Sequence, residues 1–176
     1  MKILSHLNRA ALILAGTAVI FAVSANAADK PPGKVALLLA NAGLSVVGTA
    51  SPSDPAVLNA KATGPVQTSA LGNFVENADI QARFPADPAD PVTIKGTLTL
   101  TSLDGANSLK LTVSGAALPD PAAPYFYNAK YQITITGGTG TYAAAKGLAE
   151  ATELVMFTSP LTATATWNMK GLIFTP

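Results

Sequence analysis

Hydrophobic and polar residues alternate most clearly in the middle of the chain. Residues 92–101 carry Thr or Lys at every second position, and the opposite face reads Val92, Ile94, Gly96, Leu98 and Leu100. A period of two residues is typical of a strand with one face in the core and the other in water. The same alternation resumes over 108–114 after the turn signal Asp104-Gly105, so the two segments are predicted to form an antiparallel hairpin.

Further strands are expected on both sides of this hairpin. The segment 73–84 precedes it and also alternates. Similar segments follow it at 125–136, 148–157 and 161–174. The Pro-rich stretches 85–91 and 118–124 are expected to be loops, because proline cannot donate a hydrogen bond to a sheet.

The pattern is weaker in the N-terminal part of the chain. Residues 28–44 are expected to be a lead-in to the domain, and the apolar stretch 35–42 within it is compatible with a strand or a short helix. Pro and Gly separate three short candidate strands at 45–50, 57–63 and 66–70. The folded domain is therefore expected to span 45–176.

These segments amount to about eight strands, each with one apolar face, and to no helix long enough for an α/β fold. An open sheet of this kind would leave two exposed edges, which invite pairing with other chains. Closure into a barrel, or packing of two sheets into a sandwich, avoids this. The pattern predicts a single all-β antiparallel domain.

The N-terminus has a different organisation. A short basic region within 1–9 precedes an uncharged apolar run at 10–23, and small residues follow at Ala25 and Ala27. This order is typical of a secretory signal peptide. We expect residues 1–27 to be cleaved and the protein to be exported, to the periplasm or the extracellular space of a bacterium. An uncleaved N-terminal anchor is the alternative.

Composition limits the chemistry of the exported part. The chain has no Cys, and its single histidine, His6, lies in the predicted signal peptide. Ser-His-Asp and Cys-His catalysis and Cys- or His-based zinc sites are therefore excluded after cleavage. Removal of Lys2 and Arg9 changes the net charge from +1 to about −1. We expect no metal, no cofactor, no nucleic acid and no membrane partner after cleavage.

One segment resembles a known signature. Residues 135–142 read Ile-Thr-Gly-Gly-Thr-Gly-Thr-Tyr, which is similar to the Ile-Thr-Gly-Gly-(Ser/Thr)-Gly-x-aromatic segment of the allene oxide cyclase and dirigent families. A looser similarity extends over 131–174. The resemblance implies a closed eight-stranded antiparallel barrel that accommodates a small hydrophobic molecule. It also implies a homo-oligomer, with the trimer as the form frequent in the related families. Many secreted bacterial proteins of unassigned function carry the same segment.

The glycine segment itself is interpreted as structural. Glycine allows positive φ and close approach of the backbone where a strand turns sharply. A phosphate-binding loop would need a long helix after the glycines, and none is expected here. The motif residues are Gly137, Gly138, Gly140 and Gly147, together with Tyr142 as an aromatic plug at the barrel end.

Two acidic residues interrupt otherwise apolar faces and are candidate catalytic groups. Glu76 lies in the alternating segment 73–84, and Glu153 lies in 148–157. A carboxyl group inside an apolar barrel has a raised pKa and suits general acid catalysis. Either residue faces water instead if its strand has a bulge or the opposite phase, and for Glu153 the residues Leu154 and Met156 favour the opposite phase.

Aromatic residues are candidate ligand-binding groups at a cavity mouth, with an ordinary place in the core as the alternative. They are Tyr125, Tyr127, Tyr131 and Trp167. Three hypotheses for function follow. The protein binds a small hydrophobic molecule in a barrel, or it is a cyclase or isomerase that uses a barrel carboxyl group, or it is a structural or surface protein without a ligand. A solid barrel interior would leave only the last of these.

Overall fold

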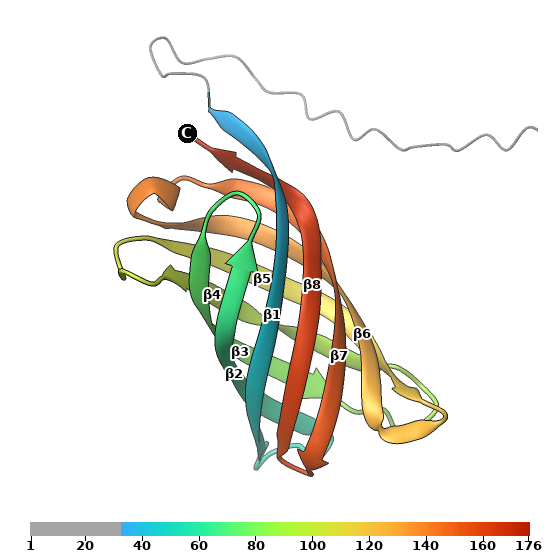
Figure 1. Ribbon diagram of the computed structural model, residues 1–176. Coiled ribbons are helices and arrows are strands. Elements are labelled where there is room, and N and C mark those ends of the chain that lie inside the picture. The colour runs from blue at the N-terminus through green and yellow to red at the C-terminus, as the bar shows by residue number, and fades with distance from the viewer. Residues whose placement is uncertain (1–32) are drawn as a thin grey trace, which may run out of the picture.

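The computed structural model describes residues 33–176, which form a closed barrel of eight antiparallel strands (Figure 1). The predicted signal peptide at 1–27 lies outside the described residues. The strands are β1 Lys34–Ala50, β2 Val57–Thr68, β3 Asn73–Arg83, β4 Val92–Ser102, β5 Ser108–Asp120, β6 Ala123–Thr139, β7 Lys146–Ser159 and β8 Thr162–Thr175. Within 33–176 no helix is long and apolar enough to cross a membrane.

Pairing between the first and last strands closes the sheet. β1 runs antiparallel to β8 from the pair Lys34 and Thr175 to the pair Val47 and Thr162. All other neighbours follow chain order, so each strand has two hydrogen-bonded partners. Closure removes both sheet edges, which is the physical reason to expect a barrel. Of the two predicted architectures, the barrel is therefore confirmed and the sandwich is not formed.

The predicted domain boundary at residue 45 is wrong. β1 begins at Lys34, so most of the expected lead-in 28–44 that the structure describes is strand, and the question of strand or helix at 35–42 is resolved as strand. The alternation was hidden because both faces of this strand are apolar. Leu38 and Leu44 face the core, whereas Val35, Leu37 and Leu39 are exposed on the outer surface.

Two other breaks expected from Pro and Gly are also absent. The candidate strands 57–63 and 66–70 merge into the single strand β2, in which Pro65 lies opposite Val75 of β3. The expected loop at 118–124 is reduced to a tight connection, because β5 pairs with β6 past an irregularity after Pro119 as far as Asp120 and Ala123. Proline is tolerated at these places since each lies at a local interruption of one ladder.

The barrel interior differs between its two halves. We call the half near the β2–β3, β4–β5 and β6–β7 connections the packed half. Its inward side chains are large and almost completely buried: Leu38, Val66, Phe74, Leu100, Leu109, Leu111, Ile135 and Ile173. The N-terminal end of β1 and the C-terminal end of β8 lie side by side at this end (Figure 1).

We call the other half, near the β1–β2, β3–β4, β5–β6 and β7–β8 connections, the cavity half. Many of its inward positions carry small residues: Gly48, Ala60, Ala82, Ala117 and Ala163. An eight-stranded barrel is about wide enough for side chains to fill it. Alanine and glycine leave that width unfilled, so an internal space remains in this half.

Candidate functional site

An internal cavity occupies the cavity half of the barrel. It leaves about 110 Å³ in which the centre of a water molecule can lie. Pockets for drug-sized ligands measure about 300–1,000 Å³, whereas a dry cavity of about 150 Å³ binds benzene. The cavity volume therefore matches a ligand of about one small ring.

The lining of the cavity is almost entirely apolar, and its polar side chains are few. They are Glu76, Tyr127, Tyr131, Glu153, Thr162 and Trp167. The alternating phases of β3, β6, β7 and β8 bring five of the predicted site residues to this one space, although they lie far apart in the sequence. We call Glu76, Glu153, Tyr131 and Trp167 the carboxyl cluster.

Glu76 is placed in the cavity by the even-numbered inward phase of β3. The residue is 1% exposed, and the indole Nε1 of Trp167 donates a hydrogen bond of 3.0 Å to its Oε2. Its Oε1 has no hydrogen-bond partner among the described residues. Every completely enclosed side-chain oxygen of residues 33–176 does have a partner, so Oε1 is not completely enclosed. The free oxygen Oε1 of Glu76 therefore borders the cavity.

Glu153 also points inward, so the alternative in which it faces water is wrong. It lies between the inward residues Ala151 and Val155, and one of its carboxyl oxygens accepts a hydrogen bond from the hydroxyl of Tyr131. Leu154 and Met156, which favoured the other phase, are exposed on the outside of the barrel. An apolar outer face on β7 made its phase ambiguous.

Burial dominates the electrostatics of the two carboxyl groups. It raises the pKa of Glu76 to about 7, against the hydrogen bond from Trp167 and with the negative charge of Glu153. Burial also raises the pKa of Glu153, and the hydrogen bond from Tyr131 opposes it. The pKa of the Tyr131 hydroxyl is raised by burial and then by Glu153. Every Lys and Arg from residue 33 onward is exposed, so no protein cation faces the cavity there.

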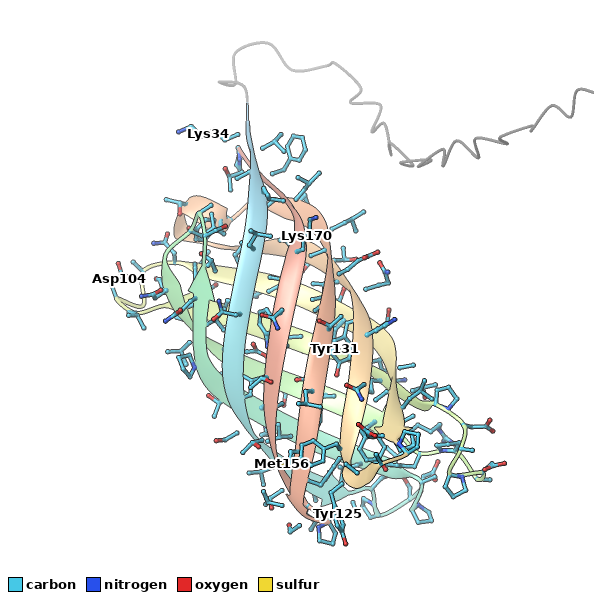
Figure 2. The ribbon with its side chains drawn as sticks, turned by 45° about the vertical axis from the view of Figure 1, so that its right-hand side comes forward. Lys34, Asp104, Tyr125, Tyr131, Met156 and Lys170 are labelled. Atoms are coloured by element: carbon cyan, nitrogen blue, oxygen red, sulfur yellow. The ribbon has the colours of Figure 1, made fainter. Side chains whose placement is uncertain are left out.

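Strand register connects the two carboxyl groups through Trp167. Glu153 on β7 lies directly opposite Trp167 on β8. The same indole that neighbours Glu153 hydrogen-bonds to Glu76 on β3. The cluster therefore spans the barrel and forms a polar patch in an otherwise apolar cavity. Figure 2 shows Tyr131, a member of the cluster, about midway along the barrel.

The aromatic residues near the β7–β8 turn, at the end of the cavity half, fall into two groups. Tyr127 packs edge to face on Phe157, with ring centroids 5.6 Å apart. These two rings and Phe84 line both the cavity and an outer depression beside the β7–β8 turn. Tyr125 is 70% exposed and lies in the outer depression instead of the cavity (Figure 2).

Sequence reasoning did not single out Phe84 and Phe157. Both continue the inward phase of their strands, so the alternation that identified Glu76 and Glu153 also contained the signal for these rings. The three rings of Phe84, Tyr127 and Phe157 lie at the border between the cavity and the outer depression, and we call them the aromatic gate.

The glycine motif lies at the packed end of the barrel, remote from the cavity. β6 contains a bulge here, since Lys110 pairs with Gly137 whereas Leu111 pairs with Ile135. The short 3-10 helix η1, Gly140–Tyr142, follows and returns the chain to β7, which passes Gly147. The motif is at the end that holds no cavity, which supports the structural interpretation.

Two glycines of the motif have a specific steric role. A Cβ on Gly138 would lie 1.8 Å from the carbonyl oxygen of Ser108, and Gly140 has a φ of +58°. The bend they allow carries Tyr142 onto Phe74, with ring centroids 6.1 Å apart. Tyr142 is half-buried against the core, in agreement with its predicted place at the barrel end.

The substitution Gly138→Ala is expected to destabilise the barrel by about 1–3 kcal/mol, because the added methyl group collides with the Ser108 carbonyl group. The measurement is the midpoint of urea unfolding followed by circular dichroism. Gly43→Ala serves as the control, since a Cβ at Gly43 has nothing within 4 Å. Equal midpoints for the two variants would contradict the steric role of Gly138.

Comparisons with known proteins give similarity in structure alone. No family model matches the chain, and no curated protein matches it. Among solved structures, the chain is similar to the pterocarpan synthase dirigent protein, with a TM-score of 0.44 and 15% sequence identity over 82% of this chain and 88% of that chain. The dirigent proteins are one of the two families that the glycine segment resembles. The fold itself is established by the strand pairing described above.

Proposed function

We propose that this protein is an exported barrel that binds a small, largely apolar molecule in its cavity half. The observation that carries the proposal is the cavity, which is closed by the packed half at one end and lined by apolar side chains around the carboxyl cluster. Burial of apolar ligand surface drives binding at such sites, and a few convergent polar groups fix the orientation. Export is supported by the residue pattern of the N-terminus.

The aromatic gate is the entry route in this proposal. Phe84, Tyr127 and Phe157 lie at the border between the cavity and the outer depression, so movement of their side chains opens one to the other. A ligand of one small ring fits the inner space, and a longer ligand extends past the gate towards Tyr125. The exposed Tyr125 then contacts only ligands that protrude.

Ligand binding has an intrinsic spectroscopic reporter. Trp167 is the only tryptophan of the chain, and it borders the cavity with its indole N–H on Glu76. Benzene and cyclohexanol are suitable probes for a cavity of this size. Saturable changes in Trp fluorescence, matched by heat in titration calorimetry, are the expected result. The absence of binding for every small-ring probe would overturn the proposal in favour of a structural protein.

Filling the cavity is expected to abolish this binding. Ala163 lines the cavity, is buried and lies opposite Phe157 in the β7–β8 register. In Ala163→Leu the larger side chain occupies ligand space, and cyclohexanol affinity is expected to fall at least tenfold, as read by calorimetry. Thr164→Gln is the matched control, since Thr164 is the next residue on β8 and faces outward. Equal affinities in the two variants would place the ligand elsewhere.

One observation favours a second function, proton-transfer catalysis on the bound molecule as in a cyclase or isomerase. Glu76 has a pKa raised to about 7 and a free oxygen on the cavity, which suits a general acid or base near neutral pH. Conversion of a bound compound by the wild type, and retained binding without conversion in Glu76→Gln, would support catalysis. Conversion at an unchanged rate in Glu76→Gln would exclude Glu76 as the acid.

A further inference from the structure

The carboxyl cluster has no protein cation beside it among residues 33–176. Glu76 and Glu153 both face a cavity whose remaining lining contains no cation, and all Lys and Arg side chains of residues 33–176 are exposed. An ionised carboxyl group buried without a counter-ion is strongly unfavourable. A ligand that brings a positive charge removes this penalty, whereas a neutral ligand leaves it in place.

The hydrogen bonds of the cluster favour the ionised carboxyl groups but do not outweigh burial, which raises the pKa of both. The indole N–H of Trp167 donates to Glu76, and the hydroxyl of Tyr131 donates to Glu153. Donation to a carboxyl oxygen favours the charged form. Both donors are neutral groups, so they do not compensate the negative charge of a carboxyl group that ionises. The free Oε1 of Glu76 borders the cavity and is available to a ligand.

From this geometry we infer, on the basis of the proposed function, that the ligand is a small lipophilic amine, bound as an ammonium ion with its N–H groups on the carboxyl cluster and its apolar body towards the aromatic gate. The charge and the apolar body match the two parts of the cavity. Charge-assisted hydrogen bonds from an ammonium group to a carboxylate are about twice as strong as neutral ones. The cavity volume of about 110 Å³ limits the body to about one ring.

Ammonium binding requires an ionised carboxylate, which makes its affinity depend on pH in a defined direction. The titratable groups that face Glu76 in the cavity are Glu153 on β7 and Tyr127 and Tyr131 on β6. The neighbouring strands β2 and β4 direct their cations, Lys61 and Lys95, outward. The pKa of Glu76 is about 7, so binding of the amine is expected to strengthen as pH rises through this value.

The test compares three probes with the same ring and different charge: cyclohexylamine, cyclohexanol and cyclohexanecarboxylate. Calorimetry between pH 5.5 and 8 is expected to give at least tenfold tighter binding of cyclohexylamine at pH 8 than at pH 5.5, with proton release on binding near pH 6. Cyclohexanol affinity is expected to change less than threefold. Cyclohexanecarboxylate is expected to bind at least tenfold more weakly than the amine at pH 8.

Substitutions test whether the carboxyl cluster causes the preference for the amine and its pH dependence. Glu76→Gln and Glu153→Gln are expected to lose most of the amine preference and its pH dependence while they still bind cyclohexanol. Asp79→Asn is the matched control, because Asp79 lies on the same strand as Glu76 but faces outward, paired with Lys61 at 3.0 Å. Preference for cyclohexanol over the amine, or amine binding that weakens as pH rises, would overturn the inference and leave the binding function intact. Failure of all three probes would overturn the proposed function itself.

Discussion

The free energy of unfolding is expected to fall by about 3 kcal/mol as pH rises from 4.5 to about 7, and Glu76→Gln is expected to remove most of this fall. Glu76 is 1% exposed in the folded barrel, where its pKa is about 7, against 4.5 for an unperturbed group. The folded state therefore holds a proton that the unfolded chain releases. The amide side chain of the Glu76→Gln variant has no such proton to lose and retains an oxygen that accepts the Trp167 hydrogen bond.

The direction in which the free energy of unfolding changes with pH follows from proton linkage. Stability falls with rising pH wherever the folded state binds more protons than the unfolded state. For Glu76 this window lies between 4.5 and about 7, and the stabilisation is fully present below it and lost above it. Glu153 acts in the same direction, because burial raises its pKa as well. Some decrease in the free energy of unfolding with rising pH is therefore expected to remain in Glu76→Gln.

Urea unfolding of the wild type and Glu76→Gln at a series of pH values from 4 to 8 measures this effect. Above pH 7 the variant is expected to be the more stable protein, even though it has lost a carboxyl group. Asp79→Asn tests whether any carboxylate on β3 behaves in this way, and its pH profile is expected to follow the wild type, since Asp79 is exposed. A wild-type stability that is constant from pH 4.5 to 7 would show that Glu76 is not buried as described.

Trp167→Ala is expected to destabilise the barrel by about 3–5 kcal/mol. Trp167 is 5% exposed and packs in the main core cluster beside the cavity, so its removal enlarges the cavity and withdraws the indole N–H that donates to Glu76. Urea unfolding followed by circular dichroism measures the loss. Asn168→Ala, at the next position on β8 and facing outward, is expected to change stability by less than about 1 kcal/mol.

Trp167→Phe separates the hydrogen bond from the packing. The smaller ring keeps most of the apolar contact but has no N–H group. The hydrogen bond from Trp167 lowers the pKa of Glu76, so its loss is expected to raise that pKa further and to extend the fall in stability to higher pH. An unchanged pH profile in Trp167→Phe would show that the indole N–H does not act on Glu76. Greater loss in Trp167→Ala than in Trp167→Phe is expected at every pH.

Much of the fold could be predicted because one face of most strands is polar. In β3 the alternation grouped Glu76 with Phe74 on one face, and in β4 it grouped Leu98 with Leu100; the structure turns both faces inward. The same reasoning failed for β1 and β7, where apolar residues cover both faces. The extent of β1 from Lys34 and the inward orientation of Glu153 followed only from pairing with neighbouring strands.

The candidate site was also predictable only in part. The sequence identified Glu76, Glu153, Tyr127, Tyr131 and Trp167 as separate candidates, and all five line the cavity. It could not show that the indole of Trp167 reaches Glu76, because 91 residues separate them and only barrel closure brings β3 and β8 to the same interior. It also could not place Tyr125, whose position depends on where the outer depression lies.

By itself the sequence determined the all-β class and the lack of thiol and imidazole chemistry beyond residue 27. It also identified the acidic and aromatic residues from which a site could be built. These properties depend on composition and on a local period of two residues. Only the tertiary structure decided that one half of the barrel is packed and the other hollow, and that two carboxyl groups share the hollow half with no Lys or Arg of residues 33–176 beside them. The physical reason is that the packing of the interior and the electrostatic environment of each carboxyl group depend on side chains from all eight strands.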